Sequence, residues 1–274
     1  MPELPEVETV RAGLERAVVG KKIAATKQLH PRALRSDSLN TLRIFKGAKI
    51  KAVKRRGKFM WFEFDREEVL VAHLGMSGQF KIQRSGSPYE AHLRANFELS
   101  NGKEMRFVDQ RTFGWLCVDQ LTDGVPKIVS HIAIDLFDPN FNKRAVVAEI
   151  SKKRGQIKKI ILDQEVLSGI GNIYADEALW LARIHPERSA SDMSSTQILN
   201  VVTAAQKVMQ RALAAGGTSF DELYINVNGE SGYFERSLAV YGREGEPCRR
   251  CGREIIRIAF ANRSSRLCPA CQTR

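Results

Sequence analysis

The stretch Met1-Pro2-Glu3-Leu4-Pro5-Glu6-Val7-Glu8-Thr9-Val10 opens the chain and predicts how the fold begins. Apolar residues recur at helical spacing from this stretch through to Val18, and Gly20 stands where such a helix would end. Proline is favoured in the first turn of a helix, so the two prolines of the stretch fit a helix start. The sequence therefore predicts an N-terminal helix.

The same stretch also permits a chemical interpretation. Removal of Met1 would leave Pro2 with a free secondary amine, which can attack an aldehyde carbon and form an iminium. A terminal amine has a pKa of about 8, so a useful fraction of it is unprotonated at neutral pH. The neighbouring Glu3 could move protons during such a reaction. The stretch alone leaves both interpretations open, a helix start and an amine nucleophile.

Short runs rich in β-branched and aromatic residues follow the helix, separated by turn-like pieces such as Ser100-Asn101-Gly102. Cys117 lies in one of these apolar runs, which predicts a buried core residue. We interpret residues 1–130 as one domain, a helix plus a sandwich or barrel of antiparallel strands. Examples of the predicted strands are residues 49–53, 59–64, 69–74, 96–99 and 115–118.

The pattern becomes helical after a linker at residues 131–139. Residues 140–236 are predicted to form a second domain, in which Gly216-Gly217 ends a long helix and residues 218–236 form a polar loop. The apolar face of that helix consists of Ile198, Val201, Val202, Ala205, Val208, Met209 and Leu213. Separate strand-rich and helical segments make the predicted fold class α+β.

Four of the five cysteines fall in the last segment, residues 237–274. Cys248 and Cys251 form one CxxC pair, Cys268 and Cys271 form another, and sixteen residues separate the pairs. This spacing suits four thiolates around a tetrahedral zinc ion. A segment this short cannot bury enough apolar surface to fold alone, so the metal would stabilise it. With all four sulfurs used, the sequence predicts one structural Zn²⁺.

Two further pieces of the second half suggest anion binding. Residues 254–260 and 266–268 are predicted as a hairpin with its turn at residues 262–265, and Arg263 in that turn either binds phosphate or is merely solvated. Two glycines precede a helix predicted from Tyr174 to Ile184 and permit close backbone approach. Asn172 in this loop either donates to a ligand or caps the helix.

The composition favours a polyanionic partner. The 274 residues carry a formal net charge of +12, and the pI is near 9.7. A basic surface of this size suits nucleic acid, although a merely solvated basic surface would look the same. No apolar run approaches the length of a membrane span, and the acidic start does not resemble a signal peptide.

Taken together, these pieces resemble the formamidopyrimidine-DNA glycosylases, bacterial enzymes that remove oxidised purines from DNA. The resemblance covers nearly the whole chain. It is carried by Pro2-Glu3-Leu4-Pro5-Glu6-Val7-Glu8-Thr9, Arg55-Arg56-Gly57-Lys58-Phe59, His73-Leu74-Gly75-Met76-Ser77-Gly78, Asp109-Gln110-Arg111-Thr112-Phe113-Gly114, Gly169-Ile170-Gly171-Asn172-Ile173-Tyr174-Ala175-Asp176-Glu177 and the four cysteines. It implies a β-sandwich with a catalytic proline, a helix-two-turn-helix domain, a zinc-finger β-hairpin, and DNA in the cleft between domains.

The resemblance also implies a mechanism. Pro2 would attack C1′ of the damaged nucleotide, the base would leave, and β and δ eliminations would cut the strand on both sides of the sugar. Glu3 would act as general acid and base. Lys58 would reach the active-site phosphate, whereas without the resemblance it would pass for a surface lysine. Arg263 would join the catalytic set and, with Asn172, grip the phosphates that flank the lesion.

Three residues match the family's hole-filling set. Met76 would occupy the space of the flipped base, Arg111 would hydrogen-bond the orphaned cytosine, and Phe113 would wedge between base pairs. The alternative is that Met76 and Phe113 are core residues. The surrounding polar sequence, Gln110-Arg111-Thr112-Phe113-Gly114, suits an exposed loop and favours the wedge.

Further roles follow from the same resemblance. The implied DNA contacts include His92, Lys158 and Tyr241. Glu6 and Thr218 would recognise the lesion, and the carbonyl of Thr218 would accept the extra N7 proton of 8-oxoguanine. The sequence departs from common family members at Gly75, Ser77, Thr112 and Ser264-Ser265-Arg266, positions that touch the DNA-contact edges.

Two rivals remain at this stage. One is an endonuclease VIII-like glycosylase for oxidised pyrimidines, against which Leu4 and the long loop at residues 218–236 argue. The other is a zinc-finger DNA-binding protein without catalysis, against which Pro2, Glu3 and Lys58 argue. We expect damaged double-stranded DNA as partner, no membrane, no organic cofactor, a monomer, and a cytoplasmic location at a bacterial nucleoid.

Overall fold

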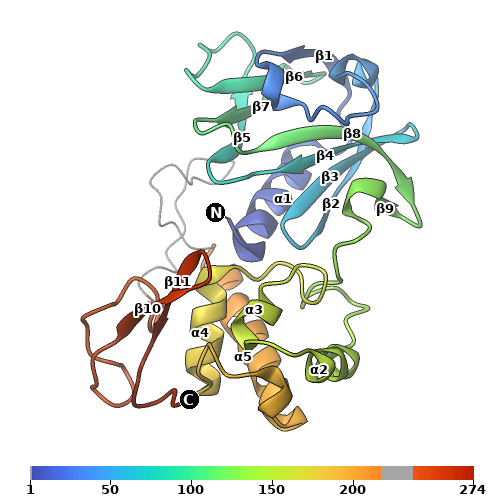
Figure 1. Ribbon diagram of the computed structural model, residues 1–274. Helices are drawn as coiled ribbons and strands as arrows, with labels where there is room; N and C mark the ends of the chain where they lie inside the picture. Colours follow the sequence, from blue (N-terminus) through green and yellow to red (C-terminus); the bar gives the residue numbers. More distant parts are fainter. Residues whose placement is uncertain (1, 217–236) are drawn as a thin grey trace. The chain divides into compact units, whose positions relative to one another are not determined.

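The computed structural model describes residues 2–216 and 237–274. These residues form two compact units, which Figure 1 shows in colours that follow the sequence. The first unit contains residues 2–131, and the second contains residues 132–215 and 237–274. No helix of the described residues is long and apolar enough to cross a membrane.

Helix α1 (Leu4–Val18) opens the first unit, as the sequence predicted. Glu3 is its N-cap and forms a capping box with Glu6, which satisfies backbone N–H groups that the first turn leaves unpaired. The helix stops two residues before Gly20, whose φ of +82° suits glycine. Val7, Val10, Leu14 and Val18 form its buried face.

Two antiparallel sheets make up most of the first unit. One sheet has the order β1 (Ile23–Gln28), β6 (Leu93–Leu99), β7 (Lys103–Asp109), β5 (Gly78–Arg84). The other has the order β2 (Ile50–Arg56), β3 (Phe59–Phe64), β4 (Glu68–His73), β8 (Trp115–Thr122), β9 (Val125–Pro126). Short 3-10 turns lie at η1 (Pro31–Ala33), η2 (Leu42–Phe45) and η3 (Lys127–Val129).

The two sheets share one hydrophobic core with α1, which makes the unit a β-sandwich rather than a barrel. Alternate residues of β3 point into this core: Met60, Phe62 and Phe64 are buried there. The ring of Phe62 meets that of Phe80 from the opposite sheet edge-on, with 5.6 Å between centroids. Cys117 is 2% exposed, which confirms it as a buried residue.

The second unit begins with four helices, α2 (Lys143–Lys152), α3 (Ile157–Ile161), α4 (Asn172–Ala182) and α5 (Ser195–Ala214), and a 3-10 turn η4 (Ala190–Asp192). Ser194 and Gln197 form a capping box at the start of α5. The predicted apolar face of α5 is buried, apart from a half-buried Leu213. Helix α4 begins two residues earlier than predicted, because Gly171 is its N-cap.

A two-stranded antiparallel hairpin, β10 (Ile256–Phe260) and β11 (Arg263–Leu267), completes the second unit. The turn predicted at residues 262–265 was wrong, because Phe260 pairs with Arg263 and leaves only Ala261 and Asn262 between the strands. Ala261 has a φ of +47°, the left-handed backbone of a tight turn. Residues 263–265 therefore belong to a strand, and their side chains alternate between its two faces.

Candidate active site

The N-terminal end of α1 holds two buried carboxylates beside Pro2. Pro2 is itself buried, and the residues Glu3 and Glu6 are 2% and 5% exposed. The backbone N–H of Glu3 donates to Oε2 of Glu6 at 2.9 Å, and the Glu3 side chain accepts from the backbone N–H of Glu6. The N-terminus of a helix stabilises negative charge. The capping box thus fixes a carboxylate one residue from the candidate amine.

Lys58 lies in the turn between β2 and β3 and is only 6% exposed. The alternative of an ordinary surface lysine does not fit this burial. Gly57, directly before it, has a φ of +55°, a conformation that glycine adopts without strain. The turn therefore holds a buried lysine side chain directly before β3.

The candidate hole-filling residues lie on two adjacent loops of the first unit. Met76 is 37% exposed and Phe113 is 52% exposed, so neither is a core residue. Arg111 is exposed too, and its guanidinium carbon lies 5.4 Å from the centroid of the Phe113 ring. Large apolar side chains in exposed loops are typical of contact surfaces.

A buried carboxylate joins these two loops. Asp109 has no exposed surface, and it accepts from the Ser77 hydroxyl at 2.6 Å and from the backbone N–H groups of Arg111 and Gly114 at 3.2 and 2.7 Å. The Ser77 hydroxyl also accepts from the Arg111 backbone N–H at 3.0 Å. Charge-assisted bonds of this kind are stronger than neutral ones, so Asp109 holds both loops in one arrangement.

Gly75 is required where these loops meet. Its φ is +61°, and a Cβ built there would lie 2.3 Å from the carbonyl carbon of Phe113 and 2.4 Å from the backbone nitrogen of Gly114. Both neighbours are backbone atoms, so they cannot swing aside as a flexible side chain would. Only glycine permits this close approach.

We expect Gly75→Ala to destabilise the protein by about 2–5 kcal/mol, the sum of left-handed backbone strain and overpacking. The measurement is urea-induced unfolding. The matched control is Gly102→Ala, because Gly102 has a φ of +72° and nothing within 4 Å of a built Cβ. The control should lose only about 1–2 kcal/mol. Equal losses in the two variants would contradict the close approach of the loops.

The four cysteines of the second unit are gathered as a metal site requires. The Sγ atoms of Cys248, Cys251, Cys268 and Cys271 all lie within 4.8 Å of one another, and Cys251 Sγ lies 3.5 Å from the Sγ atoms of Cys268 and Cys271. Zinc at about 2.3 Å from each of four tetrahedral thiolates would separate the sulfurs by about 3.8 Å. The cluster fits a structural zinc ion and leaves no thiolate for catalysis.

The zinc cluster is packed on helix α4. Trp180 of this helix donates its indole N–H to Cys248 Sγ at 3.4 Å, and the Arg250 guanidinium lies 4.2 Å from the Trp180 ring centroid. Ile255 and Val240 are buried in the same small cluster. A hydrogen bond to a metal-bound sulfur is a typical outer-shell contact of zinc sites, so α4 supports the cluster as well as covering it.

A buried ion pair anchors the hairpin on helices α3 and α4. Lys158 has no exposed surface, and its Nζ lies 2.7 Å from Oδ1 of Asp176. The same ammonium donates to the Ser265 hydroxyl at 2.6 Å and to the Ser264 carbonyl at 3.1 Å. Asp176 also accepts from the Ser265 hydroxyl and from the Arg266 backbone N–H. These bonds satisfy a buried pair that would otherwise be costly.

Two further contacts surround the same hairpin. Asn172 donates from Nδ2 to the Ser264 carbonyl at 3.1 Å, so its side chain serves as a donor and does not cap the helix. The Arg266 guanidinium carbon lies 4.3 Å from the ring centroid of Tyr241. Arg263, next to Ser264, is exposed. The hairpin therefore presents Arg263 from a base that Asn172 contacts directly.

Glu177 fixes the backbone of residues 239–241. Its buried carboxylate accepts from the backbone N–H groups of Ala239, Val240 and Tyr241 at 2.8–3.0 Å. Burial raises the pKa of this carboxyl above its usual value, and the three N–H donors oppose the rise. The carboxylate thereby sets where Tyr241 emerges beside the hairpin.

Comparisons with known proteins agree along the whole chain. A model of the formamidopyrimidine-DNA glycosylase N-terminal domain matches residues 1–116, and a model of the H2TH domain of the same enzyme matches residues 132–222. A model of the zinc finger found in FPG and IleRS matches residues 245–274. The chain belongs to the formamidopyrimidine-DNA glycosylase family. The resemblance stated from the sequence is confirmed, and so is the four-cysteine zinc finger.

Individual members of the glycosylase family match the chain over its full length. A formamidopyrimidine-DNA glycosylase of Acidothermus cellulolyticus is 52% identical over 277 residues, which cover 99% of this chain and 97% of that protein. A Lactococcus lactis Fpg (MutM) solved with Fapy-dG-containing DNA is 32% identical, covers 99% of this chain and 100% of its own, and has a TM-score of 0.89. A MutM structure with carbocyclic 8-oxo-G-containing DNA is also 32% identical, covers 100% of both chains, and has a TM-score of 0.87.

Within this member of the glycosylase family, the predicted site residues fall into local groups. In the second unit, Lys158, Asn172 and Tyr241 surround the hairpin of Arg263. The side chain of Lys158 is wholly buried beneath the hairpin, and its predicted contact with DNA stays a prediction.

In the first unit, the structure brings together Met76, Arg111 and Phe113, and a fourth predicted residue lies beside them. The carbonyl of His92 accepts from the backbone N–H of Asp109 at 2.9 Å, which places His92 next to these loops. Thr218 lies outside the described residues.

Four residues of the resembling motifs have structural roles that the sequence did not predict: Arg55, Asp109, Asp176 and Glu177. A usable signal existed for two of them. Asp176 and Glu177 are the charged residues of the otherwise uncharged helix α4, and a charge on an apolar helix is usually paired. Asp109 and Arg55 stand at strand ends, where a polar residue looks like the start of a loop.

Proposed function

We propose that this chain is a bifunctional DNA glycosylase and AP lyase of base-excision repair that removes oxidised purines, 8-oxoguanine and formamidopyrimidines, from duplex DNA. The observation that carries the proposal is the N-terminal end of α1. There, a proline that can carry the terminal amine is followed by a buried carboxylate held in a capping box. The family membership supports the same reaction class.

The proposed reaction uses three side chains of the first unit. The Pro2 nitrogen forms a bond to C1′ of the damaged nucleotide while the bond from C1′ to the base breaks. Glu3 donates a proton as the sugar ring opens and then moves protons during elimination. Removal of a proton from C2′ releases the 3′ phosphate, and a second elimination releases the 5′ phosphate. Lys58 contacts the active-site phosphate and assists proton transfer.

We propose that damaged double-stranded DNA contacts both units. Met76, Arg111 and Phe113 enter the stack where the lesion nucleotide leaves it, which offsets part of the few kcal/mol that base flipping costs. His92 adds a contact beside them. Asn172, Tyr241 and Arg263 bind phosphates, and Arg263 also assists the elimination steps. We assign Lys158 to holding the hairpin in place from beneath.

Two groups of the protein recognise the lesion in this proposal. Glu6 and the Thr218 carbonyl read the damaged base, and the complexes of related proteins with Fapy-dG and 8-oxo-G support purine lesions as substrates. We propose a division into a catalytic domain at residues 1–130, a linker at 131–139, a helix-two-turn-helix domain with its recognition loop at 140–236, and a zinc finger at 237–274. The enzyme acts as a monomer in the bacterial cytoplasm, at the nucleoid.

The test is a borohydride trap. Protein whose intact mass shows that it starts at Pro2 is incubated with a duplex containing 8-oxoguanine opposite cytosine. We expect a covalent protein–DNA adduct with borohydride, and strand cleavage on both sides of the sugar without it. A duplex with thymine glycol tests the oxidised-pyrimidine alternative. Tight binding with neither adduct nor cleavage would contradict the proposal and favour a DNA-binding protein without catalysis.

A salt titration tests the phosphate contact of Arg263. We expect Arg263→Ala to weaken binding and to make the slope of log K against log salt shallower by about 1, because one counterion fewer is released. The matched control is Arg253→Ala, which removes the same charge from another exposed position of the zinc finger. A slope equal to that of the wild type, or the same change in both variants, would argue against this contact.

A further inference from the structure

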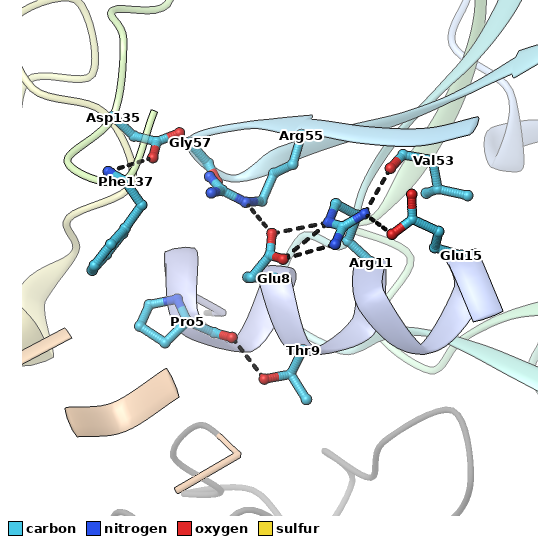
Figure 2. A network of polar contacts seen from close by, with 10 residues as sticks. All are labelled: Pro5, Glu8, Thr9, Arg11, Glu15, Val53, Arg55, Gly57, Asp135 and Phe137. Atoms are coloured by element: carbon cyan, nitrogen blue, oxygen red, sulfur yellow. Dashed lines mark hydrogen bonds and ion pairs between the residues drawn. The ribbon is translucent and has the colours of Figure 1, made fainter. Parts of the chain in front are cut away.

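One carboxylate joins helix α1 to strand β2 in the first unit (Figure 2). Glu8 Oε2 accepts from the Arg55 Nε at 2.9 Å, and both oxygens of Glu8 accept from Arg11 at 2.9–3.0 Å. Burial raises the pKa of the Glu8 carboxyl, but the hydrogen bonds from Arg11 and Arg55 outweigh it and hold the pKa below its usual value. Glu8 is therefore an anion shared between the two guanidinium groups.

The contacts also fix the direction of the strand against the helix. Arg11 donates to the Val53 carbonyl at 2.8 Å, while Glu8, one turn nearer the N-terminus, binds Arg55. The strand therefore runs towards the N-terminal end of α1, rising about 3.3 Å per residue. Figure 2 shows Gly57 at the same end of the helix as Pro5. The turn that carries Lys58 thus lies towards the end of α1 that carries Pro2 and Glu3.

Arg55 binds this turn directly as well. While its Nε donates to Glu8, its terminal Nη1 donates to the carbonyl of Gly57 at 3.1 Å. Lys58 is the next residue. The Arg55 side chain is only 9% exposed, so water competes little for these bonds. A guanidinium offers several donors in a rigid planar fork, which a lysine ammonium does not.

We propose that Arg55 and Glu8 are positioning residues, which hold the Lys58 turn in register with the helix end that carries Pro2 and Glu3. The inference rests on the proposed function, because it assumes the reaction roles of Pro2, Glu3 and Lys58. A misplacement of about 1 Å can cost roughly 100-fold in rate. The pair acts through the peptide of Gly57 and touches no reacting atom.

The test compares variants in single-turnover strand cleavage of a duplex with a preformed abasic site. Arg55→Lys keeps the charge but loses the fork, and we expect the cleavage rate to fall about 10- to 100-fold with unchanged Kd for DNA. The cleavage rate of Glu8→Ala should fall by a similar factor. Glu8→Gln should recover most of the rate, because its amide oxygen can still accept from Arg55. The control is Glu15→Gln, since Glu15 accepts from Arg11 at 2.7 Å and lies on the other side of Arg11 from Arg55 (Figure 2).

Titration with borohydride gives the number of reactive N-termini in each preparation and separates positioning from loss of folded protein. A lower cleavage rate per reactive terminus supports the inference. Cleavage that falls only in proportion to reactive termini, or a wild-type rate in Arg55→Lys, overturns it while the proposed function stands. Wild-type protein that yields no adduct overturns the proposed function, and this inference with it.

Discussion

Glu3→Gln should lower the rate of base excision by about 100- to 10,000-fold, the usual range for a lost general acid or base. The substitution separates chemistry from structure at this position. The Glu3 side chain accepts a hydrogen bond from the backbone N–H of Glu6, and a glutamine amide oxygen can accept the same bond. The start of α1 should therefore survive while proton transfer is lost. Single-turnover release of 8-oxoguanine measures the effect.

Two comparisons accompany this variant. Thermal unfolding should change little relative to wild type, whereas Glu3→Ala should also lose stability by about 1 kcal/mol through loss of the cap. On a preformed abasic site, which needs no base release, the rate of Glu3→Gln relative to wild type should fall less than it does on 8-oxoguanine. Wild-type excision by Glu3→Gln in folded protein would remove Glu3 from the mechanism.

Cys268→Ser should abolish stable zinc binding and weaken DNA binding by about 100-fold. Zinc binding supplies about 10–16 kcal/mol in small fingers, and the described cluster buries few other apolar side chains. Loss of the finger would displace Arg263 and Tyr241. Two charge-assisted contacts of about 1.5 kcal/mol each account for a loss of this size. Fluorescence anisotropy with an abasic duplex and zinc analysis by mass spectrometry measure both effects.

Cys117→Ala is the matched control for the zinc variant. Cys117 is the cysteine outside the cluster, buried in the first unit, so its removal should leave zinc content and DNA affinity unchanged. Chelation of wild-type protein should reproduce the loss of affinity, and added zinc should restore it. Full DNA affinity in zinc-free Cys268→Ser would show that the finger makes no contribution to binding.

Periodic segments of the fold were predictable from the sequence, and segments that depend on distant partners were not. Strand β3 reads Phe59-Met60-Trp61-Phe62-Glu63-Phe64, an apolar run whose alternate residues face the core. Strand β1 carries Lys27 and Gln28 and is largely exposed, so its local sequence gives a weak strand signal. Its pairing with β6, about 70 residues away, supplies the missing stability.

The candidate site likewise contains residues that local sequence predicts and residues whose positions depend on distant partners. Pro2 and Glu3 could be predicted as site residues because a proline behind the initiator methionine can expose an amine, and the cysteines because their spacing suits zinc. The hairpin turn was misplaced because Ser264 and Ser265 look like turn residues. In the folded chain, Ser265 binds Asp176, 89 residues away, and this contact draws the serines into β11. No local sequence pattern predicts such a bond.

The Asp109 carboxylate has a thermodynamic consequence for lesion binding. Because it joins the loops of Ser77, Arg111 and Gly114, their backbones are already ordered before any duplex arrives. Immobilising a side chain on binding costs about 0.5–1.5 kcal/mol, and ordering a loop adds to this. With the backbone preorganised, only the exposed tips of Met76, Arg111 and Phe113 would lose freedom if they enter the stack as proposed. The entropic cost of arranging the loops would therefore be met during folding, and more of the binding free energy would remain available for kinking the DNA.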